Sequence, residues 1–191
     1  TALGDWNGDG IEDFAISAPY ANVNRGVVYI IYGKVGYRSD LYVSTLSVSD
    51  GMRIISETAS SAGYSLAGVG DINGDGRNDL LIGAPYEHDR AGLSYLVYGN
   101  PSPADIVLSN WNDRIGVLLL GSMSKAQSGY CSVSVGDMNG DGLSDFAIGE
   151  PFANVMSTGM VRILFGCSNN CFGGNVSLDS LSANGFSVIG T

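Results

Sequence analysis

The chain has 191 residues, of which 45% are hydrophobic and 15% charged, so it can bury a core and is not disordered. Its 28 glycines do not recur at every third position, which excludes a collagen-like rod and indicates many tight turns. The formal net charge of −10 argues against binding to nucleic acid. The longest apolar run, Val27 to Tyr32, is too short to span a bilayer, and no signal-peptide pattern opens the chain, so we expect any leader to have been removed or left out.

One motif occurs three times. Gly-Asp-x-Asn-Gly-Asp-Gly-x-x-Asp begins at Gly4, Gly70 and Gly136, an offset of 66 residues each time. Other signals keep nearly the same spacing: Pro19, Pro85 and Pro151, and the aromatic–glycine pairs Tyr32-Gly33, Tyr98-Gly99 and Phe165-Gly166. A fixed period of this size is typical of a solenoid, a propeller or an array.

The segments between the motifs have the pattern of strands. In the second repeat, runs of β-branched, aromatic and aliphatic residues cover 64–69, 80–84, 93–98 and 115–120, bounded by turn residues. No segment resembles a capped amphipathic helix of three turns. Four short strands joined by short loops predict an antiparallel meander, and a repeated meander of this kind is the blade of a β-propeller. We therefore predict an all-β chain of three four-stranded blades.

The blade boundaries follow from the period. We expect blade one at residues 1–57, with its first strand truncated, blade two at 58–121 and blade three at 122–191, together forming one propeller segment. Closed propellers have roughly four to eight blades, so three blades leave exposed edges. The sequence predicts a partial propeller, or a half-ring that is completed by further blades or by a second copy of the chain.

Each motif has the ligand spacing of a calcium loop. Oxygen-bearing side chains occupy loop positions 1, 3, 5 and 9, a backbone carbonyl is available at position 7, and glycine at position 6 allows a sharp turn, as in the first part of an EF-hand. The predicted ligands are Asp5, Asn7, Asp9, the Ile11 carbonyl and Asp13 in loop one; Asp71, Asn73, Asp75, the Arg77 carbonyl and Asp79 in loop two; and Asp137, Asn139, Asp141, the Leu143 carbonyl and Asp145 in loop three. Position 12 is Ile82 in loop two, so the bidentate glutamate of an EF-hand is missing.

The clustering of charge supports these calcium sites. Nine of the 19 acidic residues are the loop aspartates, and we expect the three carboxylates of each loop to converge. Their repulsion without a counter-ion would cost on the order of several kcal/mol per loop. Acidic turns solvated by water are the alternative, and magnesium fits less well because it demands octahedral geometry.

The predicted metal sites lack the usual partners for catalysis. His88 is the only histidine, and no loop has an adjacent Cys, His or spare carboxylate in an acid–base role. We therefore expect three structural calcium ions that fix the turns between first and second strands, and a chain that is not an enzyme. A catalytic metal is the alternative.

The repeats resemble a known family. Gly63-Tyr64-Ser65-Leu66, followed by the motif and by Pro85-Tyr86, is similar to the FG-GAP repeat of integrin α-subunit propellers. The third repeat resembles it too, with Glu150 where the family has alanine, and the first keeps the loop and Ser17-Ala18-Pro19. The resemblance covers nearly the whole chain and implies three blades of a seven-bladed, calcium-stabilised, extracellular propeller. Lectins and an accessory domain of a secreted phospholipase have similar repeats, so the fold does not decide the function.

The meander topology separates two rims. The loops between strands one and two lie on one rim, and the loops between strands two and three lie on the other, which the resemblance implies is the recognition face. On that face an aromatic residue follows each repeated proline: Tyr20, Tyr86 and Phe152. We consider them candidate contacts for a protein or glycan ligand, because aromatic anchors are common in interfaces. Packing at the blade edge is the alternative.

Cysteines and an acceptor sequence favour a secreted chain. We expect a disulfide between Cys167 and Cys171, which are separated by three residues, and Asn175-Val176-Ser177 is an N-glycosylation acceptor. Together they favour an extracellular or cell-surface location. Cys131 remains, and we expect it to be a buried thiol.

The sequence therefore predicts a calcium-stabilised, integrin-α-like propeller segment for extracellular adhesion or ligand recognition. The alternatives are a carbohydrate-binding lectin, with a sugar pocket lined by Trp or Tyr between blades, and an accessory propeller domain of a secreted hydrolase.

Overall fold

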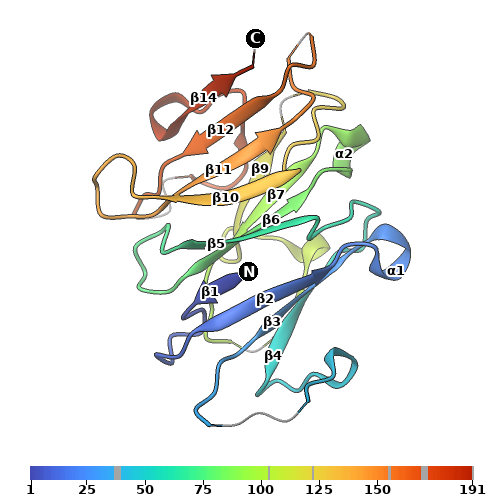
Figure 1. Cartoon of the computed structure of the whole chain (residues 1–191), viewed down its shortest axis with the longest axis vertical. Coiled ribbons are helices and arrows are strands. Elements are labelled where there is room, and N and C mark those ends of the chain that lie inside the picture. The colour runs from blue at the N-terminus through green and yellow to red at the C-terminus, as the bar shows by residue number, and fades with distance from the viewer. Residues whose placement is uncertain (37–39, 103, 122, 155, 169–171, 191) are drawn as a thin grey trace.

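The chain folds as three mostly antiparallel sheets. The computed structural model describes residues 1–36, 40–102, 104–121, 123–154, 156–168 and 172–190. The sheets lie one after another along the long axis of the molecule and do not close a ring (Figure 1). The meander strands are β1 Ala2–Gly4, β2 Asp13–Ala18, β3 Val27–Ile31 and β4 Gly51–Ile55 in blade one; β5 Ser65–Gly70, β6 Asp79–Ala84, β7 Leu93–Val97 and β9 Gly116–Leu120 in blade two; and β10 Cys131–Gly136, β11 Asp145–Glu150, β12 Met160–Leu164 and β14 Gly185–Ile189 in blade three. The predicted all-β architecture of partial propeller blades is confirmed.

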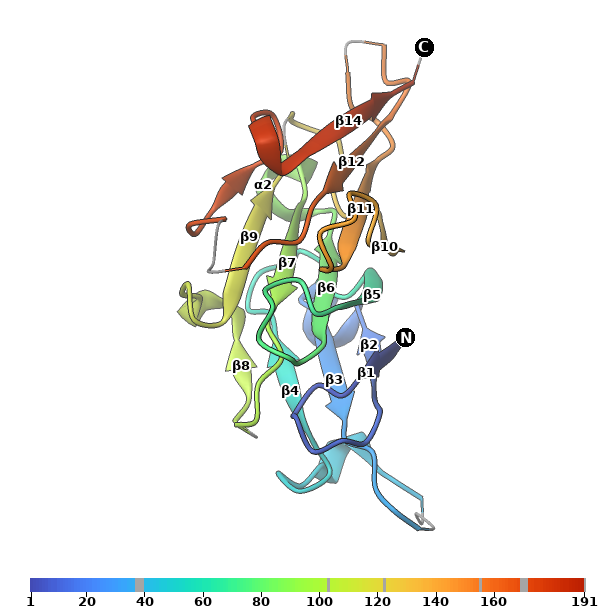
Figure 2. The same cartoon turned by 90° about the vertical axis from the view of Figure 1, so that its left-hand side faces the viewer.

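Blades one and two have a fifth strand that the sequence does not predict. Strand β8, Ile106–Val107, pairs in parallel with β4, and β13, Val176–Ser177, pairs in parallel with β9. Figure 2 shows β8 beside β4. Both short strands come from the connection between the third and fourth strands of the following blade. The predicted four-stranded meander is present in each blade, and the connection from the following blade adds a fifth strand that covers the outer edge of the neighbouring sheet.

Helical segments in the described residues are single turns. They are α1 Ala21–Asn24, α2 Glu87–Arg90 and the 3₁₀ turns η1 Val43–Thr45, η2 Leu108–Asn110 and η3 Ser182–Asn184. Among the described residues, none of these helices has the length or the apolar character that crossing a membrane requires.

The core lies in two layers between the blades. Leu80 and Ile82 of β6 are fully buried against blade one, where they join a cluster that includes Ile30 and Ile54. Leu81, between them in sequence, belongs to the cluster that blade two shares with blade three. Successive side chains of a strand point to opposite faces, so a middle blade must be apolar on both.

The third blade contains a buried ion pair in place of apolar packing. Glu150 takes the repeat position of Ala84, and its Oε2 accepts a hydrogen bond of 2.7 Å from Nε of Arg162. The Arg162 guanidinium also donates to Ser187 Oγ at 2.8 Å and to Asp179 Oδ1 at 3.3 Å. The Arg162 guanidinium therefore compensates the carboxylate charge of Glu150, the residue that stands where the FG-GAP repeat has alanine.

The cysteines differ from expectation in one case. Cys131 is exposed on the outward face of blade three, so the prediction of a buried thiol is wrong. The cause is that no further blade covers this face in the described structure. Cys167 is disulfide-bonded, but Cys171 lies outside the described residues, so their pairing stays a prediction.

Packing between blades predicts unequal effects at one repeat position. Ile72 is fully buried in the layer between blades two and three, whereas Met138, one repeat later, is 53% exposed. Ile72→Ala should lower the free energy of unfolding by about 2–5 kcal/mol, because it leaves a cavity. Met138→Ala should change it by no more than about 0.5 kcal/mol. Denaturant unfolding of both variants measures the difference, and equal losses would contradict this account of the core.

Candidate metal centre

The three acidic loops lie along one rim of the molecule. They connect β1 to β2, β5 to β6 and β10 to β11, and Figure 1 shows them on the side opposite α1 and α2. The loops between second and third strands, which contain α1 and α2, form the other rim. The two rims are therefore separated by the length of the strands.

The first aspartate of each loop organises the turn that follows. In loop two, Asp71 Oδ1 accepts hydrogen bonds from the backbone N–H groups of Gly74 at 2.7 Å and Asp75 at 3.1 Å. Its Oδ2 accepts one from Gly76 N at 2.8 Å. Asp5 and Asp137 make the same three contacts in their loops. The carboxylate of the first aspartate thus holds the five residues that follow it in a tight turn.

The side chains at positions 3 and 5 continue this arrangement. Asn73 Oδ1 accepts from Asp75 N at 2.9 Å, and Asp75 Oδ1 accepts from Arg77 N at 2.9 Å. The Asn73 amide also donates to Asp75 Oδ2 at 3.2 Å. Loops one and three repeat these bonds. The three loops therefore share one conformation, down to individual hydrogen bonds.

Glycine is required at three points of this conformation. Gly70 forms a bulge at the end of β5 with a φ of 77°, and Gly74 and Gly76 have φ values of 76° and 85°. These left-handed conformations disfavour side chains with a Cβ. The glycines at loop positions 4 and 6 have positive φ values in all three loops, which confirms the sharp turn predicted at position 6.

The last aspartate of each loop is buried beneath it and joins it to the sheet. Asp79 is fully buried; its Oδ2 accepts from Ile72 N at 2.9 Å and its Oδ1 from Gly99 N at 2.8 Å. Burial raises the pKa of Asp79 to about 7, against the lowering effect of these two N–H groups. The same two contacts recur at Asp13, with Trp6 and Gly33, and at Asp145, with Met138 and Gly166.

The glycine partners of these aspartates are functional residues that we did not predict. Gly99 follows β7, and a Cβ there would lie 2.7 Å from the Asn78 carbonyl oxygen, so no side chain fits. The signal was present as the repeated aromatic–glycine pair. Its role was hidden because Asp79 and Gly99 lie 20 residues apart and meet only after two strands have paired.

The three carboxylates of a loop accept backbone N–H groups in this conformation. Among the residues that the structure describes, no group of three His, Cys, Asp or Glu side chains is arranged to hold a metal ion. In loop two, Asp71 and Asp75 accept hydrogen bonds from their own loop, and Asp79 is bound to backbone below it. Backbone N–H groups thus take up carboxylate oxygens in this conformation, and the convergence of the carboxylates on an ion stays a prediction.

The donor set nevertheless fits calcium. All five predicted ligands of a loop supply oxygen, which a hard cation prefers. A carboxylate or amide oxygen has two lone pairs. Asn73 Oδ1 and Asp75 Oδ1 each accept one hydrogen bond, which leaves each of them a lone pair for an ion. Calcium binding itself stays a prediction.

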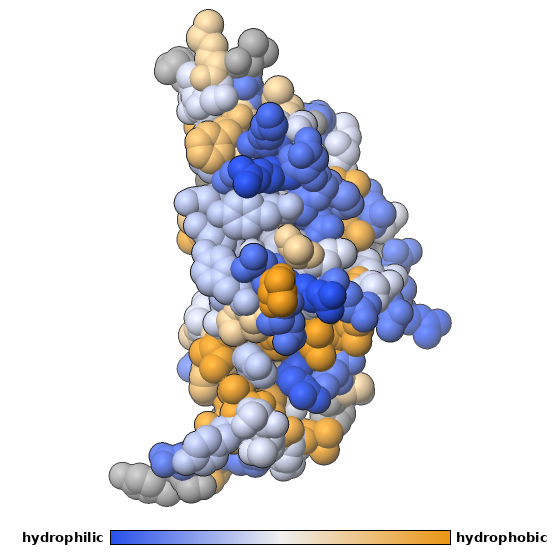
Figure 3. All heavy atoms as spheres, turned by 90° about the vertical axis from the view of Figure 1, so that its right-hand side faces the viewer, coloured by the Kyte–Doolittle hydropathy of each residue, from blue (hydrophilic) through white to orange (hydrophobic). Residues whose placement is uncertain are grey.

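The three aromatic candidates on the other rim do not form one patch. Tyr20, 63% exposed, and Tyr86 line a cavity of about 340 Å³ together with Arg90. Tyr86 also packs edge-on against Tyr64, with ring centroids 5.7 Å apart. Phe152 is half-exposed and is not part of the cavity lining. Figure 3 shows this rim as a mixture of hydrophilic and hydrophobic side chains.

The chain is similar to FG-GAP repeats and to integrin α subunits. A sequence model of the FG-GAP repeat matches residues 1–31, 62–97 and 132–178. Integrin alpha-V of Gallus gallus is 33% identical over 166 residues and integrin alpha-5 of Xenopus laevis 32% identical over 165, each alignment covering 86% of this chain. Integrin alpha pat-2 of Caenorhabditis elegans is 25% identical over 209 residues, covering 100% of the chain.

The chain spans about 15% of the length of these relatives. The repeat model nevertheless matches more than half of the chain, and the matched segments contain all three acidic loops. Sequence and architecture agree, and the chain belongs to the FG-GAP repeat family of integrin α-subunit β-propellers.

Proposed function

We propose that this chain is a calcium-stabilised propeller segment that acts in extracellular adhesion or ligand recognition. The observation that carries the proposal is the shared conformation of the three loops. A turn between two strands needs only glycines in the right places. These loops instead keep five oxygen donors in the same order three times, which a turn alone does not require.

In loop two, Asp71, Asn73, Asp75, Asp79 and the Arg77 carbonyl would hold the ion. Calcium would supply positive charge that offsets three nearby carboxylates. Two side chains of the loop hold its shape: Asp71 accepts hydrogen bonds from the backbone of the turn, and Asp79 joins the loop residue Ile72, after β5, to Gly99, after β7. We infer a structural role for the ion and no catalytic one.

Ligand recognition belongs, in this proposal, to the rim opposite the calcium loops. Two residues that line the cavity beside Tyr20 and Tyr86 have left-handed backbone conformations. They are Asn24 and Arg90, with φ values of 60° and 61°. Left-handed conformations at residues other than glycine cost roughly 1–2 kcal/mol each and cluster at ligand sites. Tyr20 and Tyr86 supply aromatic surface from two neighbouring blades.

The same cavity favours a lectin as the second candidate function. It lies between blades one and two, is lined by two tyrosines, and offers polar groups from Asn24, Ser61 and Arg90. Aromatic faces and hydrogen-bonding groups are what a sugar pocket needs. A protein ligand remains the first candidate because the relatives with the same repeats are integrin α subunits.

An extracellular location is supported by two features. Asn175 is exposed and directly precedes β13, so an oligosaccharide transferase reaches it without unfolding the core. Cys167 is disulfide-bonded, which is usual in oxidising compartments.

Calcium titration tests the metal sites. Isothermal titration should give three ions per chain. Asp9→Ala should reduce this to two, because it removes the ligand at position 5 of loop one, whereas Glu12→Ala, at an exposed position of the same loop outside the ligand set, should leave three. Calcium at 100 times its Kd should stabilise each site by about 2.7 kcal/mol. Absence of calcium uptake, or equal stoichiometry in both variants, would refute the proposal.

Secretion from a eukaryotic cell tests the location. We expect one N-linked glycan, which Asn175→Gln and Ser177→Ala should each remove, as seen by mobility after glycosidase treatment. Asn110→Gln, at an exposed asparagine outside any acceptor sequence, should not change it. A secreted chain that carries no glycan would contradict this part of the proposal.

A glycan array separates the two candidate functions. A lectin should bind defined glycans and lose them on Tyr20→Ala, because that substitution removes one wall of the cavity. Met138→Ala, an exposed residue on the calcium rim, is the control. An array without bound glycans eliminates the lectin and leaves a protein ligand.

A further inference from the structure

A second cavity lies between blades one and two, at the outer half of their interface. Its volume is about 150 Å³, and the strands that line it, β7 and β9, are the third and fourth of blade two. It shares no lining residue with the cavity that contains Tyr20 and Arg90, so the two are separate sites. Its lining includes Glu57, Glu87, His88, Tyr95, Ser109 and Leu118.

Two carboxylates line this cavity without a cation beside them. Glu87 Oε2 accepts a hydrogen bond of 2.7 Å from Thr58 Oγ1, and Glu57 Oε2 accepts one from Ser109 Oγ. The other oxygen of each carboxylate, Oε1, makes no hydrogen bond within the part of the chain that the structure describes. Among the described residues, no lysine, arginine or histidine forms an ion pair with either glutamate. The cavity therefore carries negative charge and free acceptor oxygens.

A buried tyrosine hydroxyl at the same cavity also lacks a partner. Tyr95 is 6% exposed, and its ring packs against Trp111 with ring centroids 5.1 Å apart. Its hydroxyl makes no hydrogen bond to the described residues, although Tyr95 lines the cavity. Burial raises the pKa of Tyr95, and the Glu87 carboxylate adds to the increase, so the hydroxyl stays neutral. A buried hydroxyl without a partner is unfavourable, and a ligand in the cavity would supply one.

The equivalent place between blades two and three holds an arginine of the chain itself. Tyr95 pairs with Ile82 in blade two, and Arg162 pairs with Ile148, which has the repeat position of Ile82, in blade three. Arg162 therefore corresponds to Tyr95. Its guanidinium donates hydrogen bonds to Glu150 Oε2, Ser187 Oγ and Asp179 Oδ1.

Two lining residues of the cavity hold the positions of partners of Arg162. In the strand registers, Leu118 corresponds to Ser187, and Ser109 corresponds to Asp179. The cavity therefore lies in the place where the neighbouring interface holds its guanidinium.

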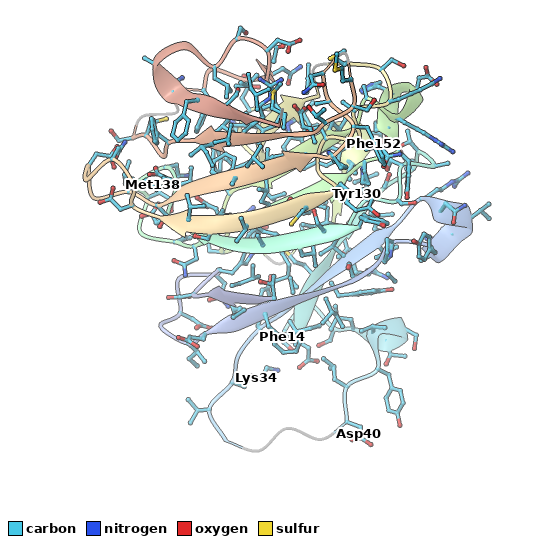
Figure 4. All side chains as sticks on the ribbon, turned by 45° about the horizontal axis from the view of Figure 1, so that its top comes forward. Phe14, Lys34, Asp40, Tyr130, Met138 and Phe152 are labelled. Carbon is cyan, nitrogen blue, oxygen red and sulfur yellow. The ribbon has the colours of Figure 1, made fainter. Side chains whose placement is uncertain are left out.

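The acidic residues come from different positions in the two interfaces. Ala84 stands where blade three has Glu150, and Ala153 stands where blade two has Glu87. Figure 4 shows Phe152, directly before Ala153, at the end of the strands where the green α2 lies. Each interface thus has carboxylates in this place, but only the interface between blades two and three has a guanidinium of its own among the described residues.

We propose that this cavity binds the guanidinium group of an arginine from a partner protein. A guanidinium has five N–H donors and no acceptor. The acceptors that remain free here are Glu57 Oε1, Glu87 Oε1 and the Tyr95 hydroxyl oxygen. A planar fork of donors serves several acceptors at once, which favours arginine over lysine.

The size of the cavity argues for a side chain of a larger molecule. A volume of about 150 Å³ corresponds to roughly five water molecules, so it holds a head group and little more. The remainder of the ligand has to lie outside, as the strand that carries Arg162 lies outside its own guanidinium site. The inference does not rest on the calcium loops or on the cavity with Tyr20 and Arg90, so it stands or fails separately from the proposed function.

An NMR titration of the whole chain tests the proposal through amide chemical shifts. The probe is the peptide acetyl-Ala-Arg-Ala-amide, and its matched control has citrulline, the neutral isostere, in place of arginine. The arginine peptide should shift the amides of Glu57, Glu87 and Ser109 to saturation. The citrulline peptide should leave them unchanged, because it lacks the positive charge.

Three variants identify the groups that bind. Glu87→Gln should weaken binding of the arginine peptide about tenfold, because it removes one charge-assisted acceptor. Tyr95→Phe should also weaken it, since it removes the hydroxyl and keeps the ring against Trp111. Glu12→Gln, which removes a carboxylate at an exposed position outside the cavity, should bind the peptide as the wild-type chain does. Propylguanidinium, the head group alone, should bind more weakly than the peptide.

Four results would overturn the proposal: no shift at the cavity at the highest soluble concentration of the arginine peptide, equal shifts with the citrulline peptide, shifts at the acidic loops alone, or unchanged affinity in Glu87→Gln. Propylguanidinium that binds as tightly as the peptide would assign the cavity to a free small guanidine and exclude the partner protein. The same spectra show whether each variant is folded, and Glu57→Gln replaces Glu87→Gln if that variant unfolds.

Discussion

The structure depends on one buried contact that is made three times: a carboxylate beneath each loop accepts two backbone N–H groups. Asp79 binds the N–H of Ile72 in its own loop and that of Gly99 after β7, so a single side chain joins three parts of one blade. A buried carboxylate is costly unless it is hydrogen-bonded, and the raised pKa of Asp79 reflects that cost. A cation above the loop would offset it. The metal proposal and the architecture of the blade therefore rest on the same residue.

Loop and interface are also coupled. The residue after the first aspartate of a loop packs on the next blade: Ile72 is buried there, and its carbonyl accepts a hydrogen bond of 2.8 Å from Cys167 N. Order in a loop thus stabilises the contact between blades as well as the turn itself. At Met138, where the described residues include no following blade, the same position is exposed. Each blade in this fold is stabilised by its contacts with the neighbouring blades, as in other repeat proteins.

The sequence was sufficient for the features that repeat locally. The period of 66 residues, the loop glycines and the short runs of strand-forming residues predicted the partial blades, the sharp turns and the meander strands correctly. Contacts between distant segments were not predictable in this way. The strand β8 is two residues long and has no pattern of its own; it exists because β4 offers an open edge. The orientation of the loop carboxylates likewise depends on N–H groups whose positions only the folded backbone fixes. Cys131 is exposed on a face that no further blade covers among the described residues.

The most direct test of the buried contact is native-state hydrogen exchange at Gly99. Its amide should exchange slowly in the wild-type chain, because it donates to Asp79 inside the protein. In Asp79→Asn, one of the two N–H groups loses its acceptor, and we expect exchange at Gly99 or Ile72 to accelerate while Gly33 and Gly166, bound to Asp13 and Asp145, keep their protection. Unchanged exchange at both Gly99 and Ile72 would show that the carboxylate does not hold loop and sheet together.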